Sequence, residues 1–378
     1  MKKFQPIIVL VALIVASCGG TGLEKGDWSK KNYKAIDAVI QQYGSSSDSY
    51  DPEVKPYAVF DFDNTTIMGD ISMSTVAYQI ENLRYRLDPE SIYFTFTNCV
   101  PNIDCSLDGF DGVSARMLAT DLQNDYAWLF NNYIKDQKLS LKEIHKSEQF
   151  LDFRAKIWAL SSGADNTFGY ETGCLWITRM FAGLSYEELE ALAREAAAQD
   201  LQMNKFKEEV WTSPNIGEAG EVSVTVPRGM RVRKELLNLY ETLQTNGFDV
   251  YVCTASEEHL VEGVACEGEG TMGFELSRDQ VYGIRVNSPV RISPNASYAQ
   301  GYPHTHHEGK SELIRSVLAP SHGGHGPAIV AGDSNGDANM LVDFADMKLG
   351  IIFDLPRTGA IADLKTDKSG RYIVQKWK

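Results

Sequence analysis

Two pairs of aspartates in this chain have the composition and spacing of a metal-dependent acid–base site. Asp61 and Asp63 are two residues apart, Asp333 and Asp337 are four apart, and each pair directly follows a short apolar run. Carboxylates held close together repel one another unless a cation neutralises them. A hard divalent ion with oxygen ligands, such as Mg²⁺, is suited to this. For the first pair, an aspartate-rich surface turn is the alternative.

Two further polar residues occupy positions where they could hold a phosphate group. Thr254 ends the apolar run 250–253, and Lys310 opens a helical pattern after Glu308-Gly309. A hydroxyl and backbone N–H groups at the end of a strand can bind a phosphoryl oxygen, and an ammonium group can neutralise its charge. Taken alone, Thr254 is better explained as a cap of the next helix, and Lys310 as an ordinary solvated lysine.

The elements that must position these residues follow an α/β pattern. The apolar runs 57–60, 250–253, 328–331 and 349–353 are separated by helical patterns, which predicts a mostly parallel sheet. In such sheets ligands bind beyond the carboxyl ends of the strands, which is where three of the four polar sites fall, while Lys310 opens a helix. Residues 67–227 instead predict an inserted helical block, with helices over Ser72–Leu87, Ser114–Lys135, Leu141–Trp158, Tyr186–Ala198 and Leu201–Val210.

The overall composition argues against nucleic-acid binding and against a zinc site. The chain has 378 residues, 43% of them hydrophobic, and a formal net charge of −15. Such an acidic chain is a poor nucleic-acid binder, because phosphate backbones would be repelled. A phosphorylated substrate must therefore be captured locally, by a metal ion and a lysine. No Cys/His cluster suggests zinc.

The N-terminus resembles a bacterial lipoprotein signal. Met1-Lys2-Lys3 is followed by an apolar run over residues 7–16, too short for a permanent transmembrane helix, and then by small residues before Cys18. This resemblance implies a signal peptide over 1–18, lipidation of Cys18, and a tether with an N-terminal helix over 19–55. The chain would then be anchored in the bacterial envelope, with Gly19 favouring the outer membrane facing the periplasm. An ordinary secretory signal is the alternative. Export permits disulfides, and Cys99–Cys105 is the best candidate pair.

Taken together, the four polar sites match a known superfamily. In order and context they resemble the motifs DxDx(T/V), a strand-terminal Thr or Ser, a lysine and GDxxxD of the haloacid dehalogenase-like superfamily, over residues 57–66 and about 228–354. The resemblance implies a Rossmann-like, mostly parallel core over 56–66 and 228–378. It further implies that residues 67–227 form a large inserted helical cap of the C1 type.

The resemblance also implies a role for each site residue. Asp61 would be the nucleophile that attacks phosphorus, and Asp63 the acid–base group. Mg²⁺ would be held by the Asp61 carboxylate, the Asp63 backbone carbonyl and Asp333. Members with an aspartate two residues after the nucleophile are phosphatases and mutases, which favours phosphoryl transfer over dehalogenation.

The remaining roles concern the phosphate and the lysine. By the same resemblance, Thr254 and Lys310 would hold the phosphoryl oxygens. Asp337 would orient Lys310 or a metal-bound water. The expected activity is the hydrolysis of a small phosphomonoester through an aspartyl-phosphate.

The substrate prediction rests on a narrower resemblance. Residues 61–72 and Ala255-Ser256 are similar to the phosphoserine and phosphorylcholine phosphatases, which implies substrate contacts for Asp70 and Ser256. Asp70 would meet an amino group, or it would only cap the helix beginning near Ser72. The tryptophans of the insertion would form an aromatic cage or ordinary core: Trp158, Trp176 and Trp211. A protein phosphatase and a non-catalytic metal- or phosphate-binding lipoprotein remain alternatives.

Overall fold

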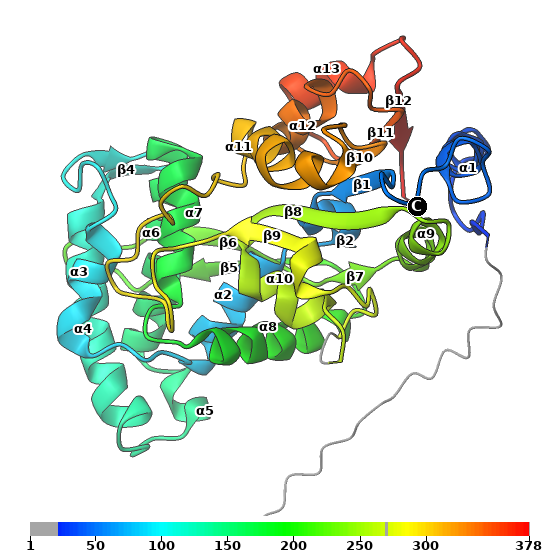
Figure 1. Ribbon diagram of the computed structural model, residues 1–378. Helices are drawn as coiled ribbons and strands as arrows, with labels where there is room; N and C mark the ends of the chain where they lie inside the picture. The colour runs from blue at the N-terminus through cyan, green and yellow to red at the C-terminus, as the bar shows by residue number, and fades with distance from the viewer. Residues whose placement is uncertain (1–21, 269–270, 378) are drawn as a thin grey trace, which may run out of the picture.

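The computed structural model describes residues 22–268 and 271–377. Its core is a six-stranded sheet in which all paired neighbours run parallel. The predicted α/β class with a Rossmann-like parallel core is confirmed (Figure 1). In spatial order the strands are β12 (Tyr372–Gln375), β11 (Leu349–Phe353), β10 (Ile329–Gly332), β1 (Tyr57–Phe60), β8 (Asp249–Glu257) and β9 (Val281–Ile284).

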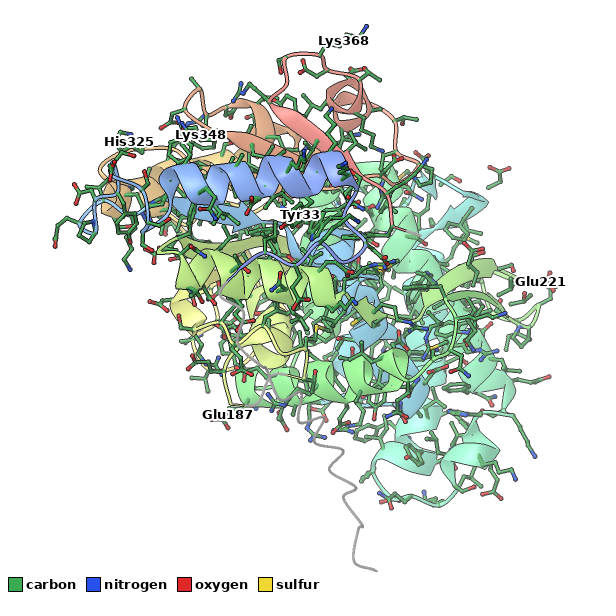
Figure 2. The ribbon with its side chains drawn as sticks, turned by 90° about the vertical axis from the view of Figure 1, so that its right-hand side faces the viewer. Tyr33, Glu187, Glu221, His325, Lys348 and Lys368 are labelled. Atoms are coloured by element: carbon green, nitrogen blue, oxygen red, sulfur yellow. The ribbon has the colours of Figure 1, made fainter. Side chains whose placement is uncertain are left out.

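Alternation along the central strand explains the two layers of helices. In β1, Ala58 and Phe60 join the cluster that includes apolar residues of α1 (Lys30–Tyr43) and α9 (Lys234–Thr245). Tyr57 and Val59 point to the opposite face of the sheet, where they belong to a second cluster of buried hydrophobic residues. There they join residues from α11 (Glu308–Leu313), α12 (Ala338–Val342) and α13 (Ala360–Lys365). Figure 2 shows α1, on which Tyr33 is labelled, lying across one side of the sheet. With both faces covered, the sheet presents its carboxyl edge to the insertion.

The insertion has helices in four of the five predicted regions, but it is not wholly helical. Its longer helices are α2 (Ile71–Asn82), α4 (Ala115–Leu129), α6 (Glu148–Phe168), α7 (Tyr170–Met180) and α8 (Tyr186–Leu201), with the shorter α3 (Ile92–Thr97) and α5 (Leu141–Ile144). Of these helices, α3 and α7 were not predicted. Two hairpins accompany them: β3 (Ser106–Leu107) with β4 (Phe110–Ser114), and β5 (Lys207–Thr212) with β6 (Ser223–Arg228).

Two of the predicted helices are wrong in detail. The helix predicted over Leu201–Val210 is instead the end of α8 followed by strand β5. The pairing with β6, whose residues alternate between exposed and buried, decides this segment, so a contact distant in sequence overrides the local pattern. The helix predicted over Leu141–Trp158 is two helices, because Ser147 caps the start of α6 with a bond from the Phe150 N–H.

A two-stranded ribbon carries the chain into and out of the insertion. β2 (Ile67–Met68) pairs antiparallel with β7 (Arg231–Val232). Just beyond it, Gly69 and Gly229 both have positive φ, and a Cβ on Gly69 would lie 2.7 Å from the Gly229 carbonyl oxygen. Only glycine allows both the conformation and this approach. The chain therefore passes between the core and the insertion close to Gly69 and Gly229.

A long connection of the core also holds the insertion in place. Arg179 of α7 donates two hydrogen bonds to the Ala296 carbonyl, at 3.0 and 2.7 Å. The Gly183 N–H donates to the Ile292 carbonyl at 2.8 Å. Residues 285–307, which follow β9, thus pack along α7 and fix this helix over the carboxyl edge of the sheet (Figure 1).

A buried charge network ties the helices of the insertion together. Lys156 of α6 is fully buried and lies 2.8 Å from both Asp121 and Asp152. Asp121 also accepts hydrogen bonds from the backbone N–H groups of Glu218 and Ala219. The loop between β5 and β6 is therefore attached to α4 and α6 by a group with no access to water.

Asp125, next to this network, gives a prediction for the pH dependence of stability. Desolvation, and then the hydrogen bond to Asp152, raise the pKa of Asp125 to about 9. In the unfolded chain this carboxyl titrates near ~3.9. Between these values the folded state holds the extra proton, so stability falls as pH rises. We expect Asp125→Asn to reduce the loss of Tm between pH 5 and pH 8, measured by calorimetry. An unchanged loss would show that Asp125 is ionised.

The structure also bears on the cysteines and the N-terminus. The suggested Cys99–Cys105 disulfide is absent, and the five described cysteines are free. The Cys105 thiol instead points to the Asn102 carbonyl oxygen at 3.3 Å. Cys18, the predicted lipidation site, lies outside the described residues. Within residues 22–268 and 271–377, no helix combines the length and hydrophobicity needed to cross a membrane.

Candidate active site

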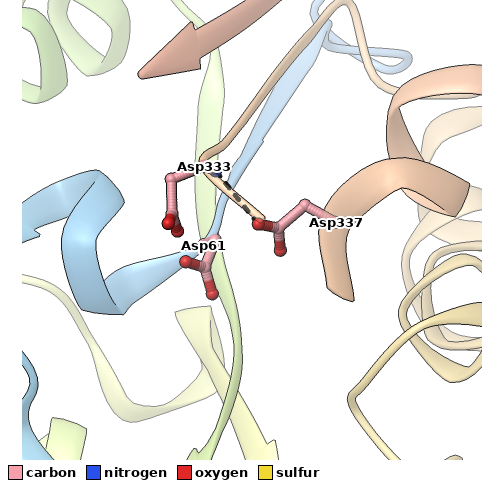
Figure 3. Close-up of side chains that lie close together, drawn as sticks. All are labelled: Asp61, Asp333 and Asp337. Atoms are coloured by element: carbon pink, nitrogen blue, oxygen red, sulfur yellow. Dashed lines mark hydrogen bonds between the residues drawn. The ribbon is translucent and has the colours of Figure 1, made fainter. Parts of the chain in front are cut away.

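The predicted site residues converge at the carboxyl edge of the central strands. Asp61 directly follows β1, Asp333 follows β10, and Thr254 lies in the neighbouring strand β8. Carboxylate oxygens of Asp61, Asp333 and Asp337 lie within 4.8 Å of one another (Figure 3). All three side chains are buried. The geometry therefore allows this acidic group to bind a metal ion.

The hydrogen bonds of Asp337 assign it a different task from the other two aspartates. Its Oδ2 accepts from the backbone N–H groups of Asp333 and Ser334, both at 3.0 Å, the first drawn dashed in Figure 3. Its Oδ1 accepts from the Lys310 ammonium at 2.7 Å. Both oxygens are thus occupied by protein donors. Asp61 and Asp333 are the better metal donors of the three.

Lys310 is positioned by its two carboxylate partners and by a tight turn. Its Nζ lies 2.7 Å from Oδ1 of both Asp61 and Asp337, and the side chain is almost fully buried. These partners outweigh desolvation and raise the pKa of Lys310, so the ammonium is charged. Gly309 precedes it, and a Cβ there would lie 1.6 Å from the His304 carbonyl oxygen. The turn into α11 therefore requires glycine at this position.

The electrostatics of Asp61 and Asp333 favour a bound cation. Desolvation raises the pKa of Asp61 to about 8, and Asp337 adds to this, while Lys310 opposes it. Desolvation and then Asp337 likewise raise the pKa of Asp333 to about 6. Among the described residues, no donor reaches Asp61 Oδ2, whereas Asp333 Oδ1 accepts from the Thr65 hydroxyl at 3.4 Å and Oδ2 from Arg357 at 3.2 Å. Two buried carboxylates, of which Asp61 keeps one oxygen without a described donor and Asp333 has one oxygen held only by a 3.4 Å contact, form a donor set that fits a hard divalent cation.

Asp63 lies outside the acidic group and is held in another way. Its Oδ1 accepts from the Ile71 N–H and its Oδ2 from the Ser256 hydroxyl, both at 2.6 Å. The Ser72 hydroxyl donates in turn to Ser256 at 2.7 Å. Desolvation, and then Asp70, raise the pKa of Asp63 well above its ordinary value. Ser256, predicted to bind substrate, is thus engaged in orienting Asp63, a carboxyl group suited to proton transfer.

The residues predicted to recognise the leaving group differ in whether they reach the cavity. Asp70 accepts from the Met73 N–H at 2.9 Å and caps α2, but it also lines the cavity described below. The predicted helix cap is therefore confirmed, and the contact of Asp70 with an amino group stays a prediction. Trp176 and Trp211 are buried in the core, and only Trp158 reaches the cavity wall. The prediction that the three tryptophans form an aromatic cage is therefore wrong.

A cavity of about 420 Å³ lies between the core and the insertion. Its floor includes Asp61, Asp63, Thr254 and Lys310, and α6 and α7 form its opposite wall. The Thr254 hydroxyl accepts from the Ser256 N–H at 3.1 Å, which orients it at the end of the strand. The three segments that carry these floor residues, together with Asp333 of a fourth, therefore present polar residues to one cavity.

Two residues at the site were missed by the sequence analysis. Arg357 pairs with Asp333, its Nη2 lying 3.2 Å from Oδ2, and it lines the cavity. Thr65, in the first motif, donates to the other oxygen of Asp333. Arg357 lies just beyond the end of β11, so the rule that ligands bind beyond strand ends could have indicated it.

Comparison with known proteins finds a protein of similar fold but no known activity. No protein-family model matches the chain, and no curated protein matches it. Among solved structures the chain is similar to a conserved, functionally unknown protein from Anaerococcus prevotii DSM 20548, at 26% identity and a TM-score of 0.83. The alignment covers 94% of each chain. The similarity therefore includes the insertion as well as the sheet.

Proposed function

We propose that this chain is a Mg²⁺-dependent phosphomonoesterase of the haloacid dehalogenase-like superfamily, using Asp61 as nucleophile. The observation that carries the proposal is the buried pair Asp61 and Asp333, whose carboxylate oxygens lie within 4.8 Å of each other beside a buried Lys310. The motif order along the sequence supports the same assignment. Mg²⁺ is the hard, oxygen-binding cation that this donor set suits.

The first step would be attack of an Asp61 carboxylate oxygen on phosphorus. A bond forms between this oxygen and phosphorus, and the bond from phosphorus to the ester oxygen breaks, with its electron pair leaving on that oxygen. Asp63, whose raised pKa favours the protonated form, would donate its proton to the leaving alcohol. An aspartyl-phosphate on Asp61 remains.

The second step would return the enzyme to its starting state. Asp63, now a carboxylate, takes a proton from a water molecule, which attacks phosphorus and displaces the Asp61 carboxylate. The Ser256 hydroxyl and the Ile71 N–H hold Asp63 in place through this exchange. Phosphate is then released, and Asp63 again carries its proton.

Charge at the site would be balanced by three groups. Asp61, the Asp63 carbonyl and Asp333 would hold Mg²⁺, which supplies shielding between the anionic ester and the anionic nucleophile. Lys310 and the Thr254 hydroxyl would bind the phosphoryl oxygens. Asp337 keeps Lys310 oriented through their 2.7 Å contact. The preorganised positive charge stabilises the negative charge of the transition state.

The cavity limits the substrate to a small phosphate ester. About 420 Å³, closed on one side by α6 and α7, holds a small organic phosphate but no folded protein surface. We extend the proposal to a small, amine-containing ester, hydrolysed in the bacterial envelope by a chain anchored through a lipid on Cys18.

Metal removal provides the direct test of the proposed function. We expect the full chain to hydrolyse p-nitrophenyl phosphate with Mg²⁺ present, to lose at least ~99% of this activity with excess EDTA, and to regain it when Mg²⁺ is added back. The reaction is followed through p-nitrophenolate absorbance, with circular dichroism to check that the fold survives chelation. Absence of turnover by folded protein with Mg²⁺ would refute the proposal.

A further inference from the structure

The cavity wall opposite the catalytic aspartates is built from one face of each of two helices. The residues contributed by α6 recur at helical spacing, as do those of α7. Five residues come from each helix: Trp158, Ser161, Ser162, Asp165 and Asn166 from α6, and Tyr170, Gly173, Cys174, Ile177 and Thr178 from α7. Asp165 is the one member of this set with a carboxyl group.

Asp165 differs from the other carboxylates of the cavity in having no partner. Six described carboxyl groups line the space, and five of them accept a hydrogen bond or form an ion pair: Asp61, Asp63, Asp70, Glu257 and Asp333. Asp165 does neither with any residue in 22–268 or 271–377. A half-buried anion without a counter-charge is unfavourable in the empty protein, and a cationic ligand would remove that cost.

The neighbouring helix leaves space for this carboxylate. Gly173 of α7 faces Asp165, and a Cβ built on it would lie 2.2 Å from Asp165 Oδ1. Any other residue at 173 would force the carboxylate to move. Glycine inside a helix is otherwise unfavourable relative to alanine, so the close approach accounts for its presence there.

Asp165 also lies within electrostatic range of the catalytic side of the cavity. Burial is the main cause that raises the pKa of the Cys174 thiol to about 12. Asp165 and then Asp70 raise this pKa further, and Lys310 lowers it. Asp165 and Lys310 therefore both lie close enough to Cys174 to act on its thiol. A small ester with its phosphate at Asp61 would extend its leaving group toward Asp165.

We propose that Asp165, in the space left by Gly173, selects phosphate esters whose leaving group carries a positive charge. The cation would take the place of the missing partner, while Mg²⁺ and Lys310 bind the phosphate end. This inference rests on the proposed function. It adds a specificity-determining residue on α6 for the amine-containing leaving group that the proposed function already includes.

The test compares esters of matched shape that differ in charge. Phosphocholine is paired with 3,3-dimethylbutyl phosphate, and phosphoethanolamine with propyl phosphate, using the full chain and Mg²⁺. We expect the wild type to favour the cationic member of at least one pair in kcat/KM. For that pair, Asp165→Asn should lower the cationic-to-neutral ratio at least ~10-fold, the factor that corresponds to ~1.4 kcal/mol.

Gly173→Ala and Asp111→Asn complete the design. Gly173→Ala keeps the charge and increases helix propensity, but it displaces the carboxylate, so we expect the same direction of change in the ratio. Asp111 is an exposed aspartate of β4, outside the cavity wall, and its substitution should leave the ratio unchanged. A wild type without charge preference, or an unaltered ratio in Asp165→Asn, would overturn the inference.

A calorimetric measurement separates this inference from the proposed function. If folded wild type hydrolyses no ester, including p-nitrophenyl phosphate, the proposed function fails. Binding of the same matched esters is then titrated directly into wild type and Asp165→Asn, because no ligand is consumed. Tighter binding of the cationic ester that is lost in Asp165→Asn would support the recognition site, and equal binding by both chains would overturn it.

Discussion

Replacing Asp61 by asparagine should abolish turnover while leaving the fold intact. The amide keeps the shape of the side chain but is a far weaker nucleophile, and it loses one of the two carboxylates proposed to hold Mg²⁺. We expect kcat for p-nitrophenyl phosphate to fall by at least ~10³-fold in Asp61→Asn, within the range seen when a catalytic unit is removed.

Stability measurements must accompany the Asp61→Asn assay. Because desolvation and the neighbouring Asp337 disfavour ionised Asp61, the neutral amide removes a cost of folding in the metal-free chain. Its bond to Lys310 is partly kept through the amide oxygen. We therefore expect a Tm close to that of wild type without metal. The exposed Asp111→Asn provides the matched control. Retained turnover in Asp61→Asn would remove Asp61 from the reaction.

Replacing Lys310 by methionine should reduce both activity and stability. Lys310 is the shared counter-ion of Asp61 and Asp337, with both contacts at 2.7 Å in a buried environment. Removing one partner of a buried ion pair leaves an uncompensated charge and costs ~3–5 kcal/mol. For a chain of this size we expect Lys310→Met to lower Tm by at least about 5 °C, as measured by calorimetry at pH 7.5.

The pH dependence distinguishes this mechanism from simple loss of packing. At lower pH, the stranded Asp61 carboxylate, whose pKa is raised chiefly by burial, can take up a proton, so part of the lost stability should return. Lys142→Met, at an exposed position of α5, serves as the control with little expected effect. Unchanged Tm and unchanged kcat/KM in Lys310→Met would show that the lysine neither stabilises the site nor binds phosphate.

The residues near strand ends could be predicted because the sheet imposes their position. Parallel strands share one carboxyl edge, so Asp61, Thr254 and Asp333 had to meet once their preceding apolar runs were identified as strands. The same rule would have indicated Arg357 after β11. Lys310 and Asp337 needed the motif order as well, since nothing local distinguishes a buried lysine from a solvated one.

The wall formed by the insertion could not be predicted in this way. Which face of α6 meets the cavity depends on how it packs against α4 and α7, and Asp165 has no local sequence signal. Gly173 has meaning only with the Asp165 carboxylate beside it. Similarly, the pairing with β6 makes β5 a strand. Tertiary packing, which the local sequence does not reveal, buries Trp176 and Trp211 in the core.

The central claim is that a phosphoryl group passes through the Asp61 carboxylate, and trapping that intermediate tests it most directly. The enzyme is quenched in acid during turnover with Mg²⁺ and reduced with borohydride, which converts an aspartyl-phosphate to homoserine. Peptide mass spectrometry then locates the change. The account predicts homoserine at position 61 in the quenched wild type and none without substrate. Modification at another residue, or rapid turnover with position 61 unmodified, would contradict it.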